Sequence, residues 1–277
     1  MKKLSIIGCG LIGGSFAALV KKYAPEINIL GIAQRSQPLL NAKKRGIIDG
    51  FELTMHPSHI ESSDIIIISS PISSVLPIIE KINTIKEKKT IIEFSSIKSF
   101  LNSPIVTKSH HTIIPMHPMG GLDVQGLDNA DASVLEGCPM IIFEDNQPIN
   151  QWIKSCSFSL IHCPSYAIHD EWMMHVSHGP YILANALPNI LSQKTDHELS
   201  QLQTVSAGGF RDTTRVSNSA IEWGLDVLWG NKHNAIAFID QIMTSLEQLK
   251  THLKNNHNDA LNDWLTMAKK TRNKVAR

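Results

Sequence analysis

The sequence has little of several features that would place it in a specialised class. Its 26 lysines and arginines nearly balance its 25 aspartates and glutamates, and the formal net charge of +1 provides no basic field to attract nucleic acid or a membrane surface. No apolar run reaches the roughly 20 residues that a membrane span needs. We therefore expect a globular protein that binds neither nucleic acid nor membrane.

Cysteine is also scarce. The four cysteines form no C-x-x-C pair, and Cys9 lies inside a glycine-rich stretch, so we expect no disulfide framework and a reducing, cytoplasmic location. Lys2 and Lys3 followed by an apolar stretch would suit a signal peptide. However, three glycines and Cys9 interrupt that stretch, and Lys21 and Lys22 follow at once. We therefore expect the segment to be part of the fold.

The first half of the chain alternates between strand-forming and helix-forming segments, which predicts βαβ units and a parallel sheet. Four consecutive isoleucines within 64–69 are typical of a strand that is buried on both faces. The predicted strands are 4–7, 28–33, 64–69, 90–94, 112–114, 139–143 and 159–162, the last two being candidates for antiparallel strands. The predicted helices of this half are 11–22, 37–45 and 74–85.

From residue 164 onward no segment is convincing as a strand, and helical periods dominate. The predicted helices are 168–177, 181–192, 197–207, 220–230, 232–255 and 259–275. We therefore predict an α/β fold with an N-terminal Rossmann-type dinucleotide-binding domain at 1–163, followed by an all-helical substrate and dimerisation domain at 164–277. Amphipathic helices without a sheet often need a second copy to cover their apolar face, so we expect a homodimer. Packing within one chain is the alternative.

A glycine-rich stretch follows the first predicted strand. Gly8, Gly10 and Gly13 have the G-x-G-x-x-G spacing and stand between a strand and a helix, the context in which this spacing indicates dinucleotide binding. Gly8 permits a tight turn, Gly10 lets a pyrophosphate approach the backbone, and Gly13 lets helix and strand pack closely. The pyrophosphate would lie at the helix N-terminus, where Leu11 and Ile12 begin the helix. The alternative is a glycine-rich turn that binds nothing.

The other cofactor contacts are expected where the next strands end. A fold that takes NAD usually has an Asp or Glu at the end of its second strand, roughly 20 residues after the glycines, to bind the ribose 2′-hydroxyl. Here Gln34, Arg35 and Ser36 form that turn, without an acid. A guanidinium and a hydroxyl suit a 2′-phosphate, so NADP is favoured, while Gln34 alone would leave NAD usable. Ser70 and Pro71, after the third strand, complete the expected cofactor site.

His117 is the candidate acid or base. It lies in His-Pro-Met-Gly-Gly between two prolines, and histidine exchanges protons near neutral pH. The alternative is a surface histidine without a catalytic role, one of 13 in the chain. His169 and His175 are six residues apart rather than the four of H-E-x-x-H, and no third ligand accompanies His175 and His178. We therefore expect no metal.

Arg211 and Arg215 are four residues apart in Gly-Gly-Phe-Arg-Asp-Thr-Thr-Arg. If this segment is helical, both side chains project from one side and suit bidentate binding of a carboxylate. An anionic substrate would need such local cations, because the net charge of +1 supplies none by itself. The alternative is a solvated, charged turn.

With these motifs the chain resembles a known family, the prephenate and arogenate dehydrogenases of tyrosine biosynthesis. The matching pieces run in order through most of the chain: Gly8 to Ser15, Ser95-Ser96-Ile97-Lys98, His117-Pro118-Met119-Gly120-Gly121, His169-Asp170 with Ser177-His178-Gly179-Pro180, and Gly209-Phe210-Arg211-Asp212-Thr213-Thr214-Arg215. The first piece is common to dinucleotide enzymes. The His-Pro-Met and Gly-Phe-Arg-Asp-x-Thr-Arg pieces are much more specific.

The resemblance implies NAD(P)-dependent oxidative decarboxylation of prephenate to 4-hydroxyphenylpyruvate, with arogenate, or both compounds, as the alternative substrate. It implies that His117 takes the proton of the ring 4-hydroxyl while hydride leaves the same carbon. It assigns Ser96 to orient His117 and Arg215 to hold a substrate carboxylate. The other residues that it places around the substrate are Arg211, Ser177, His178, Tyr181 and Trp223.

Two departures leave the choice between prephenate and arogenate open. Many prephenate-specific members have a histidine where this chain has Tyr181, and a leucine where it has Gly179. Two other functions share part of the pattern. A β-hydroxyacid dehydrogenase would use a helical lysine as its acid or base, for which we find no better claimant than His117. A nucleotide-binding regulator without turnover would keep the glycines but would not need His117, Ser96 and Arg215 together.

Overall fold

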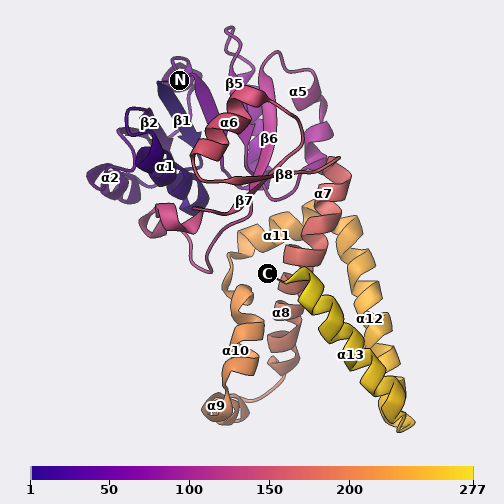
Figure 1. Cartoon of the computed structure of the whole chain (residues 1–277). Helices are drawn as coiled ribbons and strands as arrows, with labels where there is room; N and C mark the ends of the chain where they lie inside the picture. Colours follow the sequence, from indigo (N-terminus) through magenta and orange to yellow (C-terminus); the bar gives the residue numbers. More distant parts are fainter. Residues whose placement is uncertain (1, 277) are drawn as a thin grey trace. The chain divides into compact units, whose positions relative to one another are not determined.

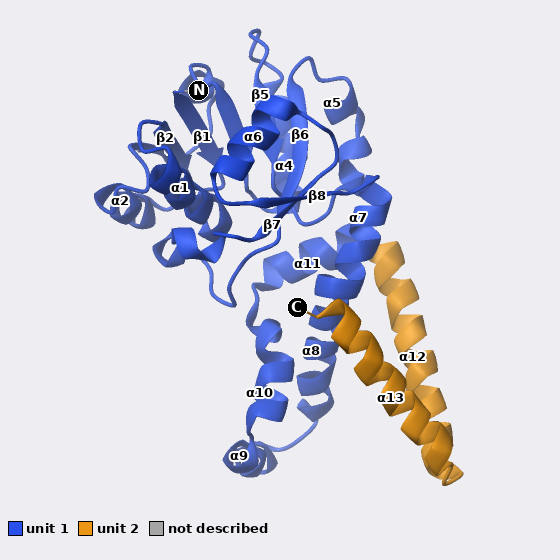
Figure 2. Ribbon diagram, in the orientation of Figure 1, with its two compact units in different colours: residues 1–231 blue, residues 232–277 orange. Residues whose placement is uncertain are grey.

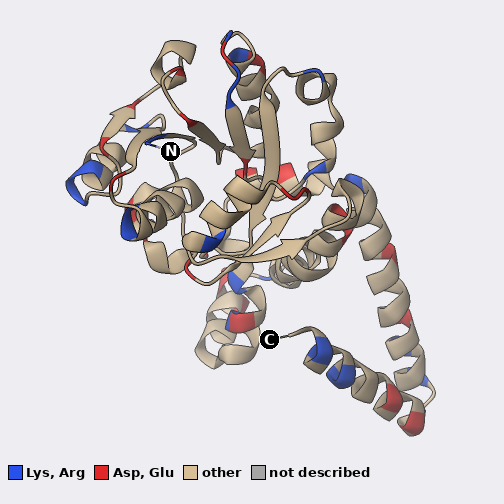
Figure 3. Cartoon of the chain, turned by 45° about the horizontal axis from the view of Figure 1, so that its top comes forward, with Lys and Arg blue, Asp and Glu red and all other residues tan. Residues whose placement is uncertain are grey.

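The computed structural model describes residues 2–276 (Figure 1). By its internal contacts the chain divides into two compact units, residues 1–231 and residues 232–277 (Figure 2). The predicted domain boundary after residue 163 therefore falls inside the first unit and stays a prediction. Figure 3 shows both kinds of charged residue, lysines and arginines and aspartates and glutamates, spread over the ribbon.

The first unit contains an eight-stranded sheet with the order β3-β2-β1-β4-β5-β6-β7-β8. The strands are β1 (Lys3–Ile7), β2 (Asn28–Ile32), β3 (Gly50–Glu52), β4 (Ile65–Ile68), β5 (Thr90–Glu93), β6 (Thr112–Pro118), β7 (Pro139–Ile142) and β8 (Ser159–His162). Neighbouring strands are parallel from β3 to β6, whereas β7 runs antiparallel to β6 and β8 runs parallel to β7. The predicted α/β fold with a Rossmann-type sheet and two late, reversed strands is thus confirmed.

Helices cover both faces of this sheet. Those of the α/β part are α1 (Leu11–Tyr23), α2 (Ser36–Lys44), α3 (Pro57–Ile60), α4 (Ile72–Ile82), α5 (Pro104–Thr107) and α6 (Gln147–Ser155). Phe16 of α1 contacts Phe94 after β5, with ring centroids 5.0 Å apart, and Trp152 of α6, at 5.7 Å. On the other face α4 buries an apolar stripe against the sheet. The four isoleucines of β4 alternate between these two cores, which explains why all four are buried.

Several elements of the α/β part differ from the sequence prediction, among them the four-residue helices α3 and α5, which were not predicted. β3 and α6 were not predicted, because β3 has only three residues and the apolar positions of α6 are few. β6 is longer than predicted: it extends through Pro118 because the backbone of 116–118 pairs with β7. His117 therefore lies on a strand, opposite Ile141, and not on a loop.

The rest of the first unit is helical, as predicted. It contains α7 (Tyr166–Met173), a π-helical turn at Met174–His178, α8 (Gly179–Leu191), α9 (Asp196–Val205), α10 (Gly208–Thr214), a 3₁₀ turn at Arg215–Asn218 and α11 (Ile221–Gly230). α10 and the turn after it pack against α8. The second unit is a helical pair, α12 (Lys232–Lys254) and α13 (Asn258–Val275), with Asn256 at φ 53° between them.

Gly8 combines a positive φ with a crowded position. Its φ of +85° lies in the left-handed region, and a Cβ there would be 2.6 Å from the carbonyl carbon of Ser69. Gly46, after α2, also has a positive φ of +72°, but a Cβ there would meet no atom within 4 Å. Both glycines therefore adopt a positive φ, but only Gly8 also lacks space for a side chain.

We predict that Gly46→Ala lowers the free energy of unfolding by about 1–2 kcal/mol, the usual cost of the left-handed conformation. Gly8→Ala should cost about 1–3 kcal/mol more than this, because the backbone of Ser69, directly after β4, must also move. Chemical denaturation of both variants measures the difference. Equal losses would show that the approach of Ser69 to Gly8 imposes no cost.

Candidate active site

The glycine-rich turn is built as a dinucleotide turn. The N–H groups of Gly8 and Cys9 both donate to Ile32 O at 3.0 Å, which joins the turn to the end of β2. Gly10 precedes α1, and no side chain caps this helix, so its first N–H groups remain available to an anion. A Cβ on Gly10 would lie no closer than 3.9 Å to another protein atom. The protein's own packing therefore does not require glycine there, whereas the close approach of a phosphate does.

The sequence-predicted cofactor residues gather at this edge of the sheet. Ser70 lies beside the turn, since a Cβ on Gly8 would be 2.5 Å from Ser70 Oγ, and Pro71 follows it as the residue before α4. Gln34, Arg35 and Ser36 are exposed after β2, and Ser36 begins α2. Arg35 reaches toward the segment after β6: a Cβ on Gly126 would be 3.7 Å from its Nη2 atom. Parallel strands end together, which is why these distant residues meet.

The same edge brings His117 close to the cofactor turn. His117 lies near the end of β6, and the chain continues through Gly120 and Gly121. A Cβ on Gly121 would lie 3.9 Å from Ile12 Cδ1, at the start of α1. The strand that carries the candidate base thus continues into a segment that adjoins the candidate pyrophosphate site.

A hydrogen-bonded row leads away from His117 into the protein. His117 Nδ1 lies 3.0 Å from His169 Nε2, and His169 Nδ1 lies 2.8 Å from Asp170 Oδ1. Asp170 also accepts from the backbone N–H of Lys98 at 2.8 Å and of Ser99 at 2.9 Å. His169 and Asp170 are buried on α7, so the row joins the helical segment to the turn after β5.

Burial sets the charges of this row. It holds the pKa of His117 well below its usual value, and repulsion from His169 and Lys98 adds to the effect. Burial likewise lowers the pKa of His169. Burial alone would raise the pKa of Asp170, but hydrogen bonds from His169, Ser99 and Lys98 outweigh it and lower this pKa. At neutral pH both rings are therefore neutral and Asp170 is ionised.

Lys98 and Glu93 form a buried ion pair beneath the row. Lys98 Nζ lies 2.5 Å from Glu93 Oε2 and also donates to Met116 O at 2.9 Å, directly before His117. Burial lowers the pKa of Lys98, although the Glu93 carboxylate opposes this shift. Because both side chains are fully buried and paired, we assign them to holding β5 and β6 in place.

A second set of predicted residues forms an aromatic group on the helical side. Tyr181 packs edge-on against Trp223, with ring centroids 5.0 Å apart, and His178 lies 6.1 Å from the same indole. Ser177, half-buried, precedes His178 in the π-helical turn. His178 is buried, its pKa falls to about 4 because of burial, and its Nε2 atom has no partner among residues 2–276. Such a neutral ring with an unused nitrogen can accept or donate one hydrogen bond.

The two arginines are placed differently. Arg215 lies in the turn after α10, and its Nη1 atom is 3.5 Å from Asp123 Oδ2, in the segment that follows His117. A partly exposed pair of this kind is worth little stability, so an incoming carboxylate can replace Asp123 at low cost. Arg211 is exposed on α10. This segment is helical, which is the condition under which the four-residue spacing of the two arginines was expected to matter.

Sequence reasoning missed part of the site. Ser96 is half-buried after β5, and within the described residues no hydrogen bond joins its hydroxyl to His117, so its orienting role stays a prediction; the ring that contacts His117 Nδ1 is His169. His169 and Asp170 appeared in the sequence as a matching piece without a function. Their adjacency was the available signal, but only the packing of α7 against the sheet shows which group they serve.

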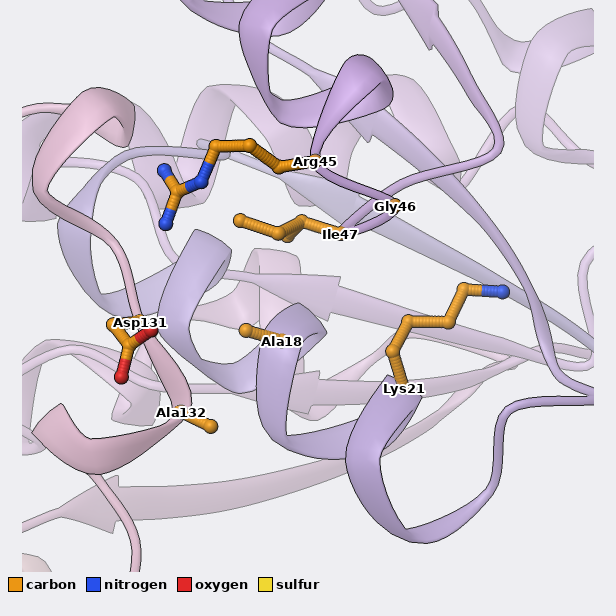
Figure 4. Close-up of a pocket in the computed structure, with 7 residues that line it drawn as sticks. All are labelled: Ala18, Lys21, Arg45, Gly46, Ile47, Asp131 and Ala132. Carbon is orange, nitrogen blue, oxygen red and sulfur yellow. The ribbon is translucent and has the colours of Figure 1, made fainter.

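A hollow of about 250 Å³ lies elsewhere, between α1, residues 45–47 after α2 and residues 131–132 (Figure 4). Its cations already have partners: Lys21 binds Asp49 at 2.7 Å, and Arg45 donates to the carbonyl oxygens of Asp128 and Ala130. We therefore place no ligand there. Over residues 2–276 no group of three or more His, Cys, Asp or Glu is placed to hold a metal ion. No helix in that range is long and apolar enough to cross a membrane.

Fold and site together define a dinucleotide-dependent dehydrogenase that has a Rossmann-type domain followed by helices. The sequence matches the family "Prephenate dehydrogenase, nucleotide-binding domain" over residues 16–163 and the family "Prephenate dehydrogenase, dimerization domain" over residues 165–267. The chain belongs to the prephenate dehydrogenase family, whose members are NAD(P)-dependent oxidoreductases.

Individual relatives agree with this assignment. The chain is 31% identical to prephenate dehydrogenase of Lactococcus lactis over 98% of its own length and 77% of that protein. It is 25% identical to cyclohexadienyl dehydrogenase of Zymomonas mobilis, over 98% and 95% of the two chains. Its fold matches prephenate dehydrogenase of Aquifex aeolicus, solved with hydroxyphenyl propionate and NAD+, with a TM-score of 0.87 and 24% identity over 99% and 98% of the chains.

Proposed function

We propose that this protein oxidatively decarboxylates prephenate to 4-hydroxyphenylpyruvate in tyrosine biosynthesis. The observation that carries the proposal is His117: a neutral ring, held through Nδ1, next to the dinucleotide turn. Family membership and the full-length relatives support this reaction. The β-hydroxyacid dehydrogenase alternative has less support, because Lys98 is buried and paired with Glu93 and is not available as the acid or base.

The proposed chemistry uses His117 as the base. Its Nε2 atom accepts the proton of the ring hydroxyl as the carbon bearing that hydroxyl is oxidised, and the ring carboxylate leaves as carbon dioxide. The bound nicotinamide supplies the hydride acceptor. Its pyrophosphate would be held by Gly8, Gly10 and the N-terminus of α1. Because His117 is already neutral in the resting protein, no proton has to be removed from it before the reaction.

Substrate binding follows from the residues that surround this base. Arg215, paired only with a partly exposed Asp123, is the proposed ligand of one substrate carboxylate, with Arg211 as a further cation. His178, Ser177, Tyr181 and Trp223 form the proposed wall beside the ring and side chain of the substrate. Arogenate replaces the keto group of prephenate with an ammonium group. Tyr181, a neutral phenol, carries no charge to exclude it, so arogenate is the second candidate substrate.

We predict that the protein reduces its nicotinamide cofactor when prephenate is the substrate. The absorbance of the reduced nicotinamide measures this reaction, and the same assay with arogenate measures which of the two substrates is preferred. His117→Asn should lower turnover about 10²- to 10⁴-fold, the usual contribution of a general base. Cofactor binding should be retained, since His117 does not hold the dinucleotide turn. Exposed His162 at the end of β8 is the matched control: His162→Leu should turn over normally. Near-normal turnover of His117→Asn would refute the assignment.

We propose NADP as the preferred cofactor. The support is the exposed turn Gln34-Arg35-Ser36, which offers a guanidinium and a hydroxyl and no carboxylate to repel a 2′-phosphate. The Nη2 atom of Arg35 lies near Gly126, 3.7 Å from where a Cβ on that glycine would be. NAD would bind the same turn with fewer hydrogen bonds, because its 2′-hydroxyl can bind only one of these two groups.

Parallel kinetics with the two cofactors test this preference. We expect a higher kcat/KM with NADP, and we expect Arg35→Ala to lower it about 10- to 100-fold for NADP, the loss of one charge-assisted hydrogen bond, while changing NAD little. Arg45→Ala, which removes a guanidinium from the opposite, C-terminal end of α2, where it binds Asp128 and Ala130, controls for a general loss of charge. A preference for NAD that Arg35→Ala leaves unaltered would contradict the proposal.

We propose a cytoplasmic homodimer. The chain carries the dimerization domain of its family, and α8, α9 and α10 surround an apolar groove of about 700 Å³. Ile190 and Val205 in this groove are 71% and 75% exposed, which is costly for apolar side chains that have no partner. Four free cysteines within the described chain suit a reducing compartment.

Light scattering should therefore give twice the 30.7 kDa of one chain. Ile190→Glu with Val205→Glu should shift the protein toward the monomer, because two carboxylates would have to be buried at the contact. Glu substitutions at Gln37 and Asn41, polar positions on α2, control for added charge. A monomeric wild type, or a dimer indifferent to the groove substitutions, would contradict this proposal.

A further inference from the structure

In the row His117–His169–Asp170, only one arrangement of the ring protons gives every hydrogen bond a donor and an acceptor. Asp170 Oδ1 receives the N–H of Lys98 and Oδ2 receives that of Ser99. Backbone N–H groups only donate, so the Asp170 carboxylate is an acceptor on both oxygens. The proton in the 2.8 Å contact between Asp170 Oδ1 and His169 Nδ1 must therefore lie on His169 Nδ1.

The next two steps follow from the chemistry of imidazole. A neutral histidine carries one ring proton, so His169, protonated at Nδ1, offers a lone pair at Nε2. His117 Nδ1, 3.0 Å away, must then be the donor of the contact between the rings. His117 is consequently protonated at Nδ1 and has its own lone pair at Nε2. The turn at Lys98 and Ser99 thus determines, through two side chains, which nitrogen of His117 is basic.

We propose that His169 and Asp170 are positioning residues that hold His117 in the tautomer with a basic Nε2, and that they stabilise this ring when it becomes charged. The proposal rests on the proposed function, in which His117 accepts the proton of a substrate hydroxyl. The substrate O–H bond breaks, an Nε2–H bond forms, and the proton stays on His117. The new imidazolium keeps donating from Nδ1 to His169, whose other nitrogen faces the Asp170 carboxylate.

Burial of His169 and Asp170 is what allows them to fix the tautomer of His117. His169 is fully buried and Asp170 nearly so, and water competes little for their hydrogen bonds. Asp170 is also tied down at its backbone, since Asn231 Nδ2 donates to Asp170 O at 2.7 Å. The row therefore cannot turn over to the opposite tautomer without leaving the lone pair of His169 Nδ1 facing the Asp170 carboxylate, an acceptor against an acceptor, which costs about 1–3 kcal/mol per unsatisfied group.

Nitrogen-15 NMR of histidine-labelled protein tests the tautomer directly, without substrate. In the wild type we expect His117 protonated at Nδ1 and unprotonated at Nε2, with the resonances assigned by His117→Asn and His169→Gln. In Asp170→Leu the acceptor of His169 Nδ1 is removed, and the single form protonated at Nδ1 should give way to a mixture of tautomers in both rings. Protonation of His117 at Nε2 in the wild type would overturn the proposal, whatever the substrate proves to be.

Kinetics then separate a positioning role from a structural one. His169→Gln keeps an oxygen where Nε2 accepts, whereas His169→Leu removes the acceptor. We expect His169→Leu to lower kcat about 10- to 100-fold, the value of one hydrogen bond to a charged group, with KM for substrate and cofactor affinity nearly unchanged. His169→Gln should recover most of this loss, and the exposed control His162→Leu should lose nothing.

The outcomes distinguish this inference from the proposed function. Activity on prephenate or arogenate with a fully active His169→Leu would refute the positioning role and leave the function intact. Equal losses in the Leu and Gln variants, with matching losses of thermal stability, would show a structural role only. Absence of turnover with both substrates, together with the expected tautomer of His117, would refute the proposed function and leave the proton arrangement standing.

Discussion

The geometry of the candidate active site depends on the hydrogen bonds that the Asp170 carboxylate accepts. This carboxylate joins the backbone at Lys98 and Ser99, after β5, to His169 on α7, and the Asp170 carbonyl binds Asn231 at the end of α11. The α/β part and the helices that follow it are thereby fixed to each other at one buried charge. Removing such a group leaves several buried donors without a partner, which is far more costly than losing a surface ion pair.

The exclusion of water around this carboxylate determines the protonation state of the nearby histidines. Burial disfavours the charged form of a ring, so His117, His169 and His178 all have lowered pKa values. Lys98, a buried cation nearby, is neutralised by Glu93 and donates a hydrogen bond to the backbone carbonyl directly before His117. A site of this kind holds a neutral base at rest and tolerates its charge only when the reaction creates it.

Much of the α/β part was predictable, because its signals are local. The isoleucine run of β4, the glycine turn and the alternation of strands with helices each depend on neighbouring residues and on burial of one face or both. β3 and the extension of β6 through Pro118 were not predictable, since three residues carry little pattern and a strand's end depends on its partner. The helical region was expected as such, but α10 required the tertiary contact with α8.

For the site, the sequence alone determined the kinds of groups: a dinucleotide turn, one candidate base at His117 and cations at Arg211 and Arg215. It also identified His169 and Asp170 as part of a motif, without a role. Only the tertiary structure decided that the partner of His117 is His169, that Asp170 is fixed by Lys98 and Ser99, and that Arg215 faces Asp123. The physical reason is that hydrogen bonds between residues about 50 to 90 positions apart leave no periodic trace in a sequence, because their geometry exists only once the strands and helices have packed.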